Sequence, residues 1–184
     1  NQRTKHTGAH LHDIGKIEKP DYFSENEPAP EKSIHDELAP SMSSLIIISH
    51  VKNGIEKARE YKIPKPVADI IAQHHGTGLV FFFYKKAEAA LKQDAAKQIK
   101  EEQFMYPGPK PQRRETAVLM LADSVEAASR TIVNPTHKRL KTLIDGLVDG
   151  RAADHQLDLT DLTFRDLTLI KETFLNLLVG QFHV

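Results

Sequence analysis

The chain combines 184 residues, enough for one sizeable core, with 25 basic and 25 acidic residues and no cysteine. The balanced charge gives no field that would attract nucleic acid or an anionic membrane, and the lack of thiols excludes disulfides, thiolate zinc sites and a cysteine nucleophile. Any bound metal must rest on nitrogen and oxygen ligands, and no apolar run approaches the roughly 18 residues needed to span a bilayer.

The first candidate for chemistry is the stretch HLHDIGKIEK at residues 10–19, which follows a start without a strong helical pattern. Its pentad begins with His12 and Asp13, an imidazole beside a carboxylate that can bridge two cations, so one reading is a hydrolytic metal site. The other reading is a helix end closed by Gly15. The pentad alone is compatible with both.

Two further helices are predicted to carry histidines on their buried faces. Apolar residues at helical spacing, with a proline just before them, predict a helix over 41–60 that includes His50. A second apolar stripe over 66–75 continues to His74 and His75, and the glycines that follow are typical of a helix end. These histidines therefore extend buried stripes.

The middle of the chain predicts less regular structure. We expect a mobile helix and a proline-rich loop within 84–114, because an Ala-, Lys- and Gln-rich stretch leads into the sequence MYPGPKPQRR. A strong helical pattern resumes over 115–132 and places Asp123 beside its apolar stripe.

The C-terminal part predicts two more helices. One runs over about 137–149, and the last begins near Phe164, where Thr163 and Asp166 resemble a helix-capping arrangement. No alternating strand pattern occurs anywhere in the sequence. The predicted fold class is all-α.

Six side chains that can bind a metal fall on or beside the buried faces of different helices. Burying them without partners would cost on the order of 1 to 3 kcal/mol each, whereas a pair of metals satisfies them together. Each histidine alone is explained by a structural role, but the set predicts a metal site. The six are His12, Asp13, His50, His74, His75 and Asp123.

Five motifs resemble those of the HD-domain phosphohydrolases: HDIGK, ISHVK, QHHGT, YPGPKPQ and MLADSVEAASR. More narrowly, they are similar to the membrane-anchored PgpH-type phosphodiesterases that degrade cyclic di-AMP. The similarity runs from His12 to about His183, and the stretch GTGLVFFFY sets the chain apart from the related GYP subgroup. The resemblance implies an all-α HD-domain helical bundle over 1–184.

The resemblance also implies how two divalent metals would be bound. Asp13 would bridge them, and His12 and Asp123 would bind the first. Iron or manganese fits both the mixture of imidazole and carboxylate ligands and the family. The ligands of the second metal would be His50, His74 and His75.

Three groups near the predicted ligands need separate interpretation. Lys16, one helical turn beyond His12, is placed to neutralise phosphate charge, so we expect it to be catalytic and substrate-binding, although a solvated lysine at a helix end explains the same residue. Arg130 is a second candidate for substrate contact, although it can instead pair with Glu126 at i and i+4. The second HD dipeptide, His35-Asp36, lies in a proline-bounded loop, where a turn or cap role is expected.

The start of the chain departs from the family pattern. Family members carry a further histidine on a helix upstream of the HD pair, and only eleven residues precede His12. His6 and His10 are the upstream histidines, and His10 lies about 200° from His12 around a helix, so both cannot face one pocket. We expect a chain that lacks the family's first helix, with the second metal site intact and the first weakened.

The function implied is hydrolysis of a cyclic dinucleotide, cyclic di-AMP to linear pApA, by water activated between two metals. Two alternatives stay open, a nucleotide-binding or regulatory HD domain with an impaired metal site and a di-iron oxygenase. We expect no DNA or RNA partner and no membrane contact from this chain itself. The parent protein is expected to be membrane-anchored with this domain in the cytosol, and assembly as a homo-oligomer is left open.

Overall fold

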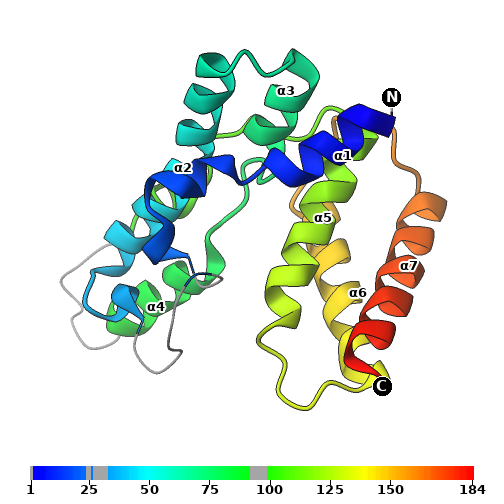
Figure 1. Cartoon of the computed structure of the whole chain (residues 1–184). Helices are drawn as coiled ribbons and strands as arrows, with labels where there is room; N and C mark the ends of the chain where they lie inside the picture. The colour runs from blue at the N-terminus through cyan, green and yellow to red at the C-terminus, as the bar shows by residue number, and fades with distance from the viewer. Residues whose placement is uncertain (1, 24–25, 27–32, 92–98) are drawn as a thin grey trace. The chain divides into compact units, whose positions relative to one another are not determined.

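The computed structural model describes residues 2–23, 26, 33–91 and 99–184, and its regular structure is helical (Figure 1). Within these ranges the single β-type pairing is one antiparallel bridge between Leu79 and Met105. The predicted all-α class is confirmed. The α-helices are α1 (Gln2–Leu11), α2 (Pro40–Glu60), α3 (Lys65–Gln73), α4 (Phe81–Leu91), α5 (Arg114–Ser129), α6 (His137–Ala153) and α7 (Phe164–Phe182).

The chain divides into two compact units. The N-terminal unit contains Asn1–Ala72 and Thr77–Pro109, and the C-terminal unit contains Gln73–Gly76 and Lys110–Val184. Each unit has a hydrophobic core of its own. The prediction of a single domain over 1–184 stays a prediction.

The core of the N-terminal unit joins residues of α2 and α3. Ala58 on α2 and Ile71 on α3 are buried, and Leu11 from the end of α1 packs against them. Helix α1 is not predicted by the sequence pattern, because its composition is polar. It is packed through Gly8, where a Cβ atom would overlap with the side chain of Ile70, so the missing side chain allows a close approach.

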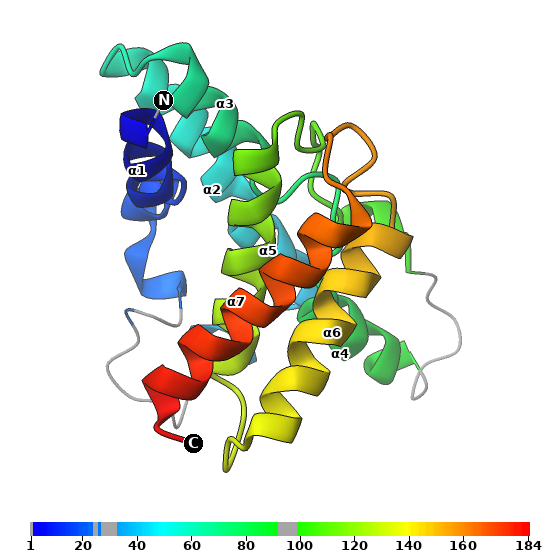
Figure 2. The same ribbon diagram turned by 90° about the vertical axis from the view of Figure 1, so that its right-hand side faces the viewer.

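The C-terminal unit consists mainly of α5, α6 and α7, which pack on one another (Figure 2). Met120 and Leu121 of α5, Leu140 and Ile144 of α6, and Leu178 of α7 are buried in its core. Helix α7 begins with the predicted cap. The Thr163 hydroxyl accepts a hydrogen bond from the Asp166 N–H, and the Asp166 carboxylate accepts one from the Thr163 N–H.

The segment predicted as a mobile helix and loop, 84–114, is partly ordered. Residues 84–91 belong to α4, 92–98 lie outside the described residues, and a 3-10 helix, η5, follows at Glu101–Phe104. Two backbone hydrogen bonds hold the start of the proline-rich loop, from Val80 N–H to the Phe104 carbonyl and from Tyr106 N–H to the Gly78 carbonyl. This end of the loop is therefore paired with 78–80, and the predicted mobility stays a prediction.

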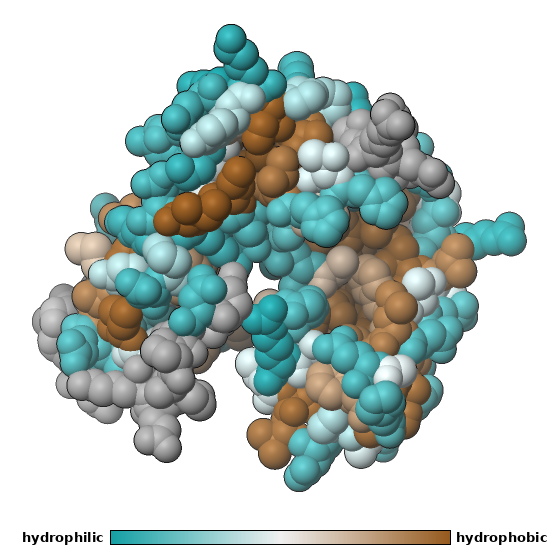
Figure 3. Space-filling view, viewed as in Figure 1, coloured by the Kyte–Doolittle hydropathy of each residue, from teal (hydrophilic) through white to brown (hydrophobic). Residues whose placement is uncertain are grey.

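Hydrophilic side chains cover much of the face in Figure 3, broken by smaller hydrophobic areas. Among the helices in the described ranges, none combines the length and the apolar character needed to cross a bilayer. The surface helices instead keep polar residues outside, as α6 does with Lys141 and Asp145, which pair at 2.6 Å.

Candidate metal centre

The HD pair lies in the turn between two helices of the N-terminal unit. Helix α1 ends at Leu11, His12 and Asp13 follow, and the 3-10 helix η1 covers Ile14–Glu18. The reading of Gly15 as a helix end is wrong, because Gly15 is buried inside η1.

Gly15 is needed for the contact between η1 and α2. A Cβ atom at this position would overlap with the carbonyl oxygen of His50 and would lie 2.5 Å from the Gly54 nitrogen. Gly54 is itself buried on the facing side of α2. Backbone therefore meets backbone here, and the sequence analysis missed both glycines as elements of the site.

This close approach brings Asp13 to His50. The Asp13 Oδ1 lies 3.3 Å from the His50 Nε2, and the Asp13 Oδ2 lies 3.2 Å from the His12 Nε2. The potential ligand atoms of Asp13 and His50 lie within 4.8 Å of one another, as do those of His12 and Asp13. One carboxylate thus faces two imidazoles.

Both imidazoles are oriented by their own helices. His50 Nδ1 lies 2.6 Å from the Ile47 carbonyl oxygen, and His12 Nδ1 lies 2.7 Å from the Ala9 carbonyl oxygen. Because a carbonyl only accepts, each Nδ1 carries the proton, and Nε2 is directed to Asp13. This is the arrangement in which a backbone carbonyl fixes the tautomer of a metal-binding histidine.

A cation fits between these groups. Two neutral imidazoles would point Nε2 lone pairs at a carboxylate, an arrangement that a divalent metal ion bound by both partners would satisfy. Imidazole nitrogen and carboxylate oxygen without thiolate suit iron, manganese or zinc. The residues of the N-terminal unit therefore fit a metal.

Lys16 is also bound to the HD carboxylate. Its Nζ lies 2.8 Å from Asp13 Oδ2 and 5.1 Å from the centre of the Phe23 ring. Phe23 in turn packs edge-on against the His50 ring, with centroids 5.8 Å apart, and Tyr106 packs edge-on against the same imidazole at 6.2 Å. His50 is only 2% exposed, because aromatic side chains surround it.

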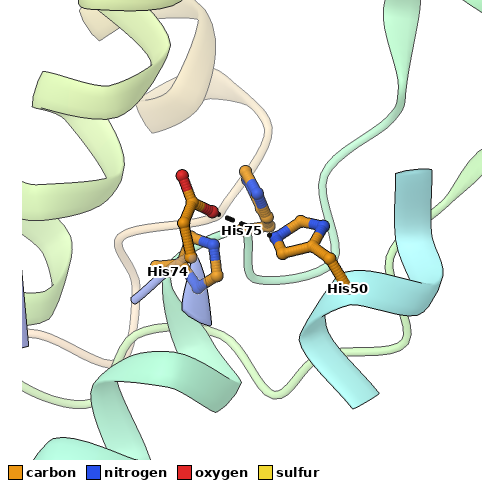
Figure 4. Close-up of side chains that lie close together, drawn as sticks. His50, His74 and His75 are labelled. Atoms are coloured by element: carbon orange, nitrogen blue, oxygen red, sulfur yellow. Dashed lines mark ion pairs between the residues drawn. The ribbon is translucent and has the colours of Figure 1, made fainter. Parts of the chain in front are cut away.

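In the C-terminal unit two histidines lie side by side in a turn. Helix α3 ends at Gln73, so His74 and His75 follow the helix instead of continuing its stripe, and the predicted end at residue 75 is wrong by two residues. Their rings lie 4.0 Å apart, and their ligand atoms lie within 4.8 Å of each other. Figure 4 shows both side chains leaving this turn, and His50 leaving α2.

The turn is determined by Gly76. Its φ of +56° is in the left-handed region that glycine adopts without strain, and its N–H donates to the Gln73 carbonyl at 2.9 Å. The Gln73 side chain accepts a hydrogen bond from the Gln112 N–H at 3.0 Å. The backbone that carries the two histidines is therefore held from both ends.

Asp123 of α5 belongs to the same unit. Its Oδ2 lies 3.8 Å from the Nδ1 of His75, and both side chains are partly buried. Its place beside the buried face of α5, not on it, agrees with the prediction. The buried face of α5 includes Met120 and Leu121, which are fully buried, whereas Val118 and Ala122 are only partly buried.

The two upstream histidines and the second HD pair do not belong to the groups of potential metal ligands within the described residues. His6 and His10 are exposed on α1, and neither belongs to a group of potential metal ligands within the described ranges. Asp36 pairs with Lys86 at 2.9 Å, which agrees with a structural role for the loop. Arg130 forms the predicted pair with Glu126, Nε to Oε1 at 2.7 Å, and its contact with substrate stays a prediction.

Among known proteins, a family described as HD domain has a model that matches residues 3–128 of this chain. The chain belongs to the HD domain family. The match begins within α1 and includes all six predicted ligands, so it passes through both units of this HD domain.

Two curated relatives carry the name cyclic-di-AMP phosphodiesterase PgpH. This HD domain is 46% identical to the Bacillus subtilis protein over 176 residues, which are 96% of this chain and 24% of that protein. It is 40% identical to the Listeria monocytogenes protein over 176 residues, again 96% of this chain and 24% of that protein. The chain thus spans about a quarter of the length of these relatives.

A solved structure supports the same resemblance. The crystal structure of the L. monocytogenes phosphodiesterase PgpH HD domain superposes with a TM-score of 0.89 at 39% identity, covering 100% of this chain and 83% of that one. A second structure of that domain, in complex with cyclic-di-AMP, gives the same TM-score and identity over 98% of this chain and 81% of that one. The resemblance predicted from the motifs is confirmed.

Proposed function

We propose that this HD domain is a metal-dependent phosphodiesterase that hydrolyses cyclic di-AMP to linear pApA. The observation that carries the proposal is the Asp13 carboxylate facing the Nε2 atoms of two tautomer-fixed imidazoles, His12 and His50. The substrate is proposed from the related PgpH domain, whose structure contains cyclic-di-AMP. The C-terminal unit adds a second histidine pair and a carboxylate of the same ligand chemistry.

Two divalent metals, iron or manganese, would be held by the six predicted ligands. Asp13 would bridge the two metals. When bound, the metals would lower the pKa of a water molecule and offset the charge of the phosphoryl oxygens. The distribution proposed from the family is His12 and Asp123 on the first metal, and His50, His74 and His75 on the second.

The chain's own residues would orient the reacting groups. The carbonyls of Ala9 and Ile47 keep the two imidazoles turned to Asp13. Lys16, held at Asp13 and one-fifth exposed, can place its ammonium near a phosphate oxygen and offset the charge that develops there. Water would add to phosphorus, the P–O bond to the 3′ oxygen would break, and that oxygen would leave as a hydroxyl.

The test is product formation with defined metals. The chain is freed of metal, given cyclic di-AMP with Mn²⁺ or Fe²⁺, and the nucleotides are separated by chromatography. Linear pApA that appears with metal and disappears with EDTA supports the proposal. Binding of cyclic di-AMP without cleavage would favour the regulatory alternative, and oxygen consumption with an organic substrate would favour the oxygenase.

A histidine control separates the site from general effects of substitution. His155 is exposed and pairs with Asp158 at 2.9 Å, outside the groups of potential metal ligands in the described ranges. His155→Ala should retain activity, whereas His50→Ala should lose it. Equal losses in both variants would refute the assignment.

Metal content gives an independent measure. Elemental analysis of the purified chain should find up to two iron or manganese ions per chain, and His74→Ala should lower that number. Retention of the full content in His74→Ala would contradict a role of the C-terminal unit in metal binding.

A further inference from the structure

The second HD dipeptide ties two segments of the N-terminal unit together. His35 is 7% exposed, and its Nε2 donates a hydrogen bond to the Tyr22 carbonyl at 2.8 Å. Its ring packs against Phe83 of α4, with centroids 4.8 Å apart, and against the Tyr22 ring at 5.8 Å. His35 therefore connects the backbone at Tyr22 to α4.

The hydrogen bond defines the form of His35. Because the Tyr22 carbonyl accepts from Nε2, the neutral ring carries its proton there, and Nδ1 is left as a bare acceptor. Nδ1 is buried and has no hydrogen-bond partner within the described residues. Within the part of the chain that the structure describes, the polar contact of the ring is the one at Nε2.

Asp36 adds a second connection to the same helix. Its Oδ1 lies 2.9 Å from the Nζ of Lys86 on α4. The hydrogen bond from Lys86 lowers the pKa of the Asp36 carboxyl, so this carboxylate is charged at neutral pH. The dipeptide is attached to α4 through both of its side chains.

Tyr22 is the residue immediately before Phe23, which borders the proposed centre. Phe23 is buried, packs edge-on against His50 at 5.8 Å, and lies under the ammonium of Lys16 at 5.1 Å. Holding the Tyr22 carbonyl therefore limits where the Phe23 ring can lie. A displaced Phe23 would release both a metal-binding imidazole and the cation above the ring.

We propose that His35 is a positioning residue that, through Tyr22 and Phe23, holds the His50 imidazole and the Lys16 ammonium in place. Its importance for catalysis rests on the proposed function, whereas its effect on His50 and Lys16 does not. A buried histidine that only filled space would act through its volume. A positioning histidine acts through its Nε2 hydrogen bond.

Two substitutions separate volume from hydrogen bonding. His35→Leu keeps roughly the size of the side chain and removes the hydrogen-bond donor. His35→Gln places an amide N–H where Nε2 lies. His35→Asn, whose shorter amide does not reach Tyr22, is a second variant without the donor. His155→Leu in the C-terminal unit is the matched control, because His155 is exposed.

The first measurement is NMR of the metal-free 184-residue chain. The imidazole signals of His50 and the Cε–H signals of Lys16 report the ring current of Phe23. We expect both to shift in His35→Leu and His35→Asn, to return toward the native positions in His35→Gln, and to stay unchanged in His155→Leu. Unchanged His50 and Lys16 signals in a folded donor-less variant would overturn the proposal.

The second measurement is turnover of cyclic di-AMP with saturating metal. Loss of partners outside the ligand shell costs about 10-fold to 100-fold in activity, and the more distant His35 should fall at the lower end, with kcat reduced about 10-fold and largely restored in His35→Gln. Equal losses in the leucine and glutamine variants would also overturn it. If neither the native chain nor any variant produces pApA, the proposed function fails. The NMR result then still decides the role of His35.

Discussion

The two units hold their histidines in place by different means. In the N-terminal unit, His12 and His50 each have Nδ1 at a carbonyl three residues earlier in the chain. In the C-terminal unit, His74 and His75 lie in a turn that a left-handed glycine closes. One unit fixes rings by hydrogen bonds, and the other fixes the backbone that carries them.

This difference predicts how substitutions in each unit would displace the histidines. A ring held by its own hydrogen bond can be displaced alone, since the backbone around it keeps its helical form. A turn that carries two adjacent proposed ligands moves both at once. We therefore expect the loss of one ring-holding contact in the N-terminal unit to affect one proposed ligand, whereas a change at Asp13 affects both imidazoles.

Asp13→Ala should have the largest effect. We expect loss of measurable pApA formation and the loss of bound metal, because Asp13 is the group that faces both imidazoles. The helices should largely remain, since Asp13 contributes little to either core, and circular dichroism would show this. A variant that keeps native turnover would refute the site.

Gly15→Ala should follow, with an effect on both folding and activity. The added Cβ would overlap with the His50 carbonyl oxygen, so η1 and α2 must separate. We expect the free energy of unfolding to fall by about 3 kcal/mol, the upper end for overpacking, as measured by urea denaturation.

Gly146→Ala is the matched control for this substitution. Gly146 is inside α6, and a Cβ there meets nothing within 4 Å. Replacing a helical glycine with alanine should raise stability by about 0.5 to 1 kcal/mol. A Gly15→Ala variant that is as stable as the native chain, or that gains stability as the control does, would contradict the close approach.

Gly76→Ala tests the turn in the C-terminal unit. The left-handed backbone costs a residue with a Cβ about 1 to 2 kcal/mol, and the new atom would lie 2.5 Å from Gln156 Oε1 and 2.8 Å from Met120 Cε. We expect stability to fall by about 2 kcal/mol, with the NMR signals of His74 and His75 shifted together. Shifted NMR signals of only one of the two imidazoles would contradict the expected difference between the units.

Arg130→Ala should have the smallest effect. The pair of Arg130 with Glu126 is half-exposed, and such i and i+4 pairs contribute about 0.3 to 0.5 kcal/mol. Thermal denaturation should hardly change. A KM for cyclic di-AMP raised several-fold, at unchanged kcat, would instead show that Arg130 contacts substrate.

The sequence predicts elements well where local signals agree. Pro40 marks the start of α2, and Thr163 with Asp166 marks the start of α7, because both signals act within one helical turn. The all-α class and the six candidate ligands follow from helical spacing together with the motifs. These are features that neighbouring residues determine.

Other features depend on contacts between distant residues and are missed. Helix α1 has a polar composition and is packed through Gly8 against Ile70, about sixty residues later in the chain. The role of Gly15 depends on His50 and Gly54. The letters of the HDIGK motif contain the glycine, but only the fold shows which backbone it must approach.

The end of α3 illustrates a third kind of difference. The apolar stripe of 66–75 extends through both histidines, so helical spacing predicts that the helix continues. The left-handed conformation of Gly76 bends the backbone into a turn that begins after Gln73. Gly76 is the sequence signal for the end of the helix, but the spacing of the apolar residues does not say how many residues before this glycine the turn begins.

The course of the chain through the two units has a practical consequence for protein engineering. The C-terminal unit includes the four residues Gln73–Gly76, which are flanked in the sequence by segments of the N-terminal unit. The rest of the C-terminal unit begins at Lys110. A protein cut at Pro109 would separate Gly76 from Met120 and Gln156, the groups that it approaches. No single cut yields two complete halves, so split-protein reporters or domain exchanges should keep the whole chain as one cassette.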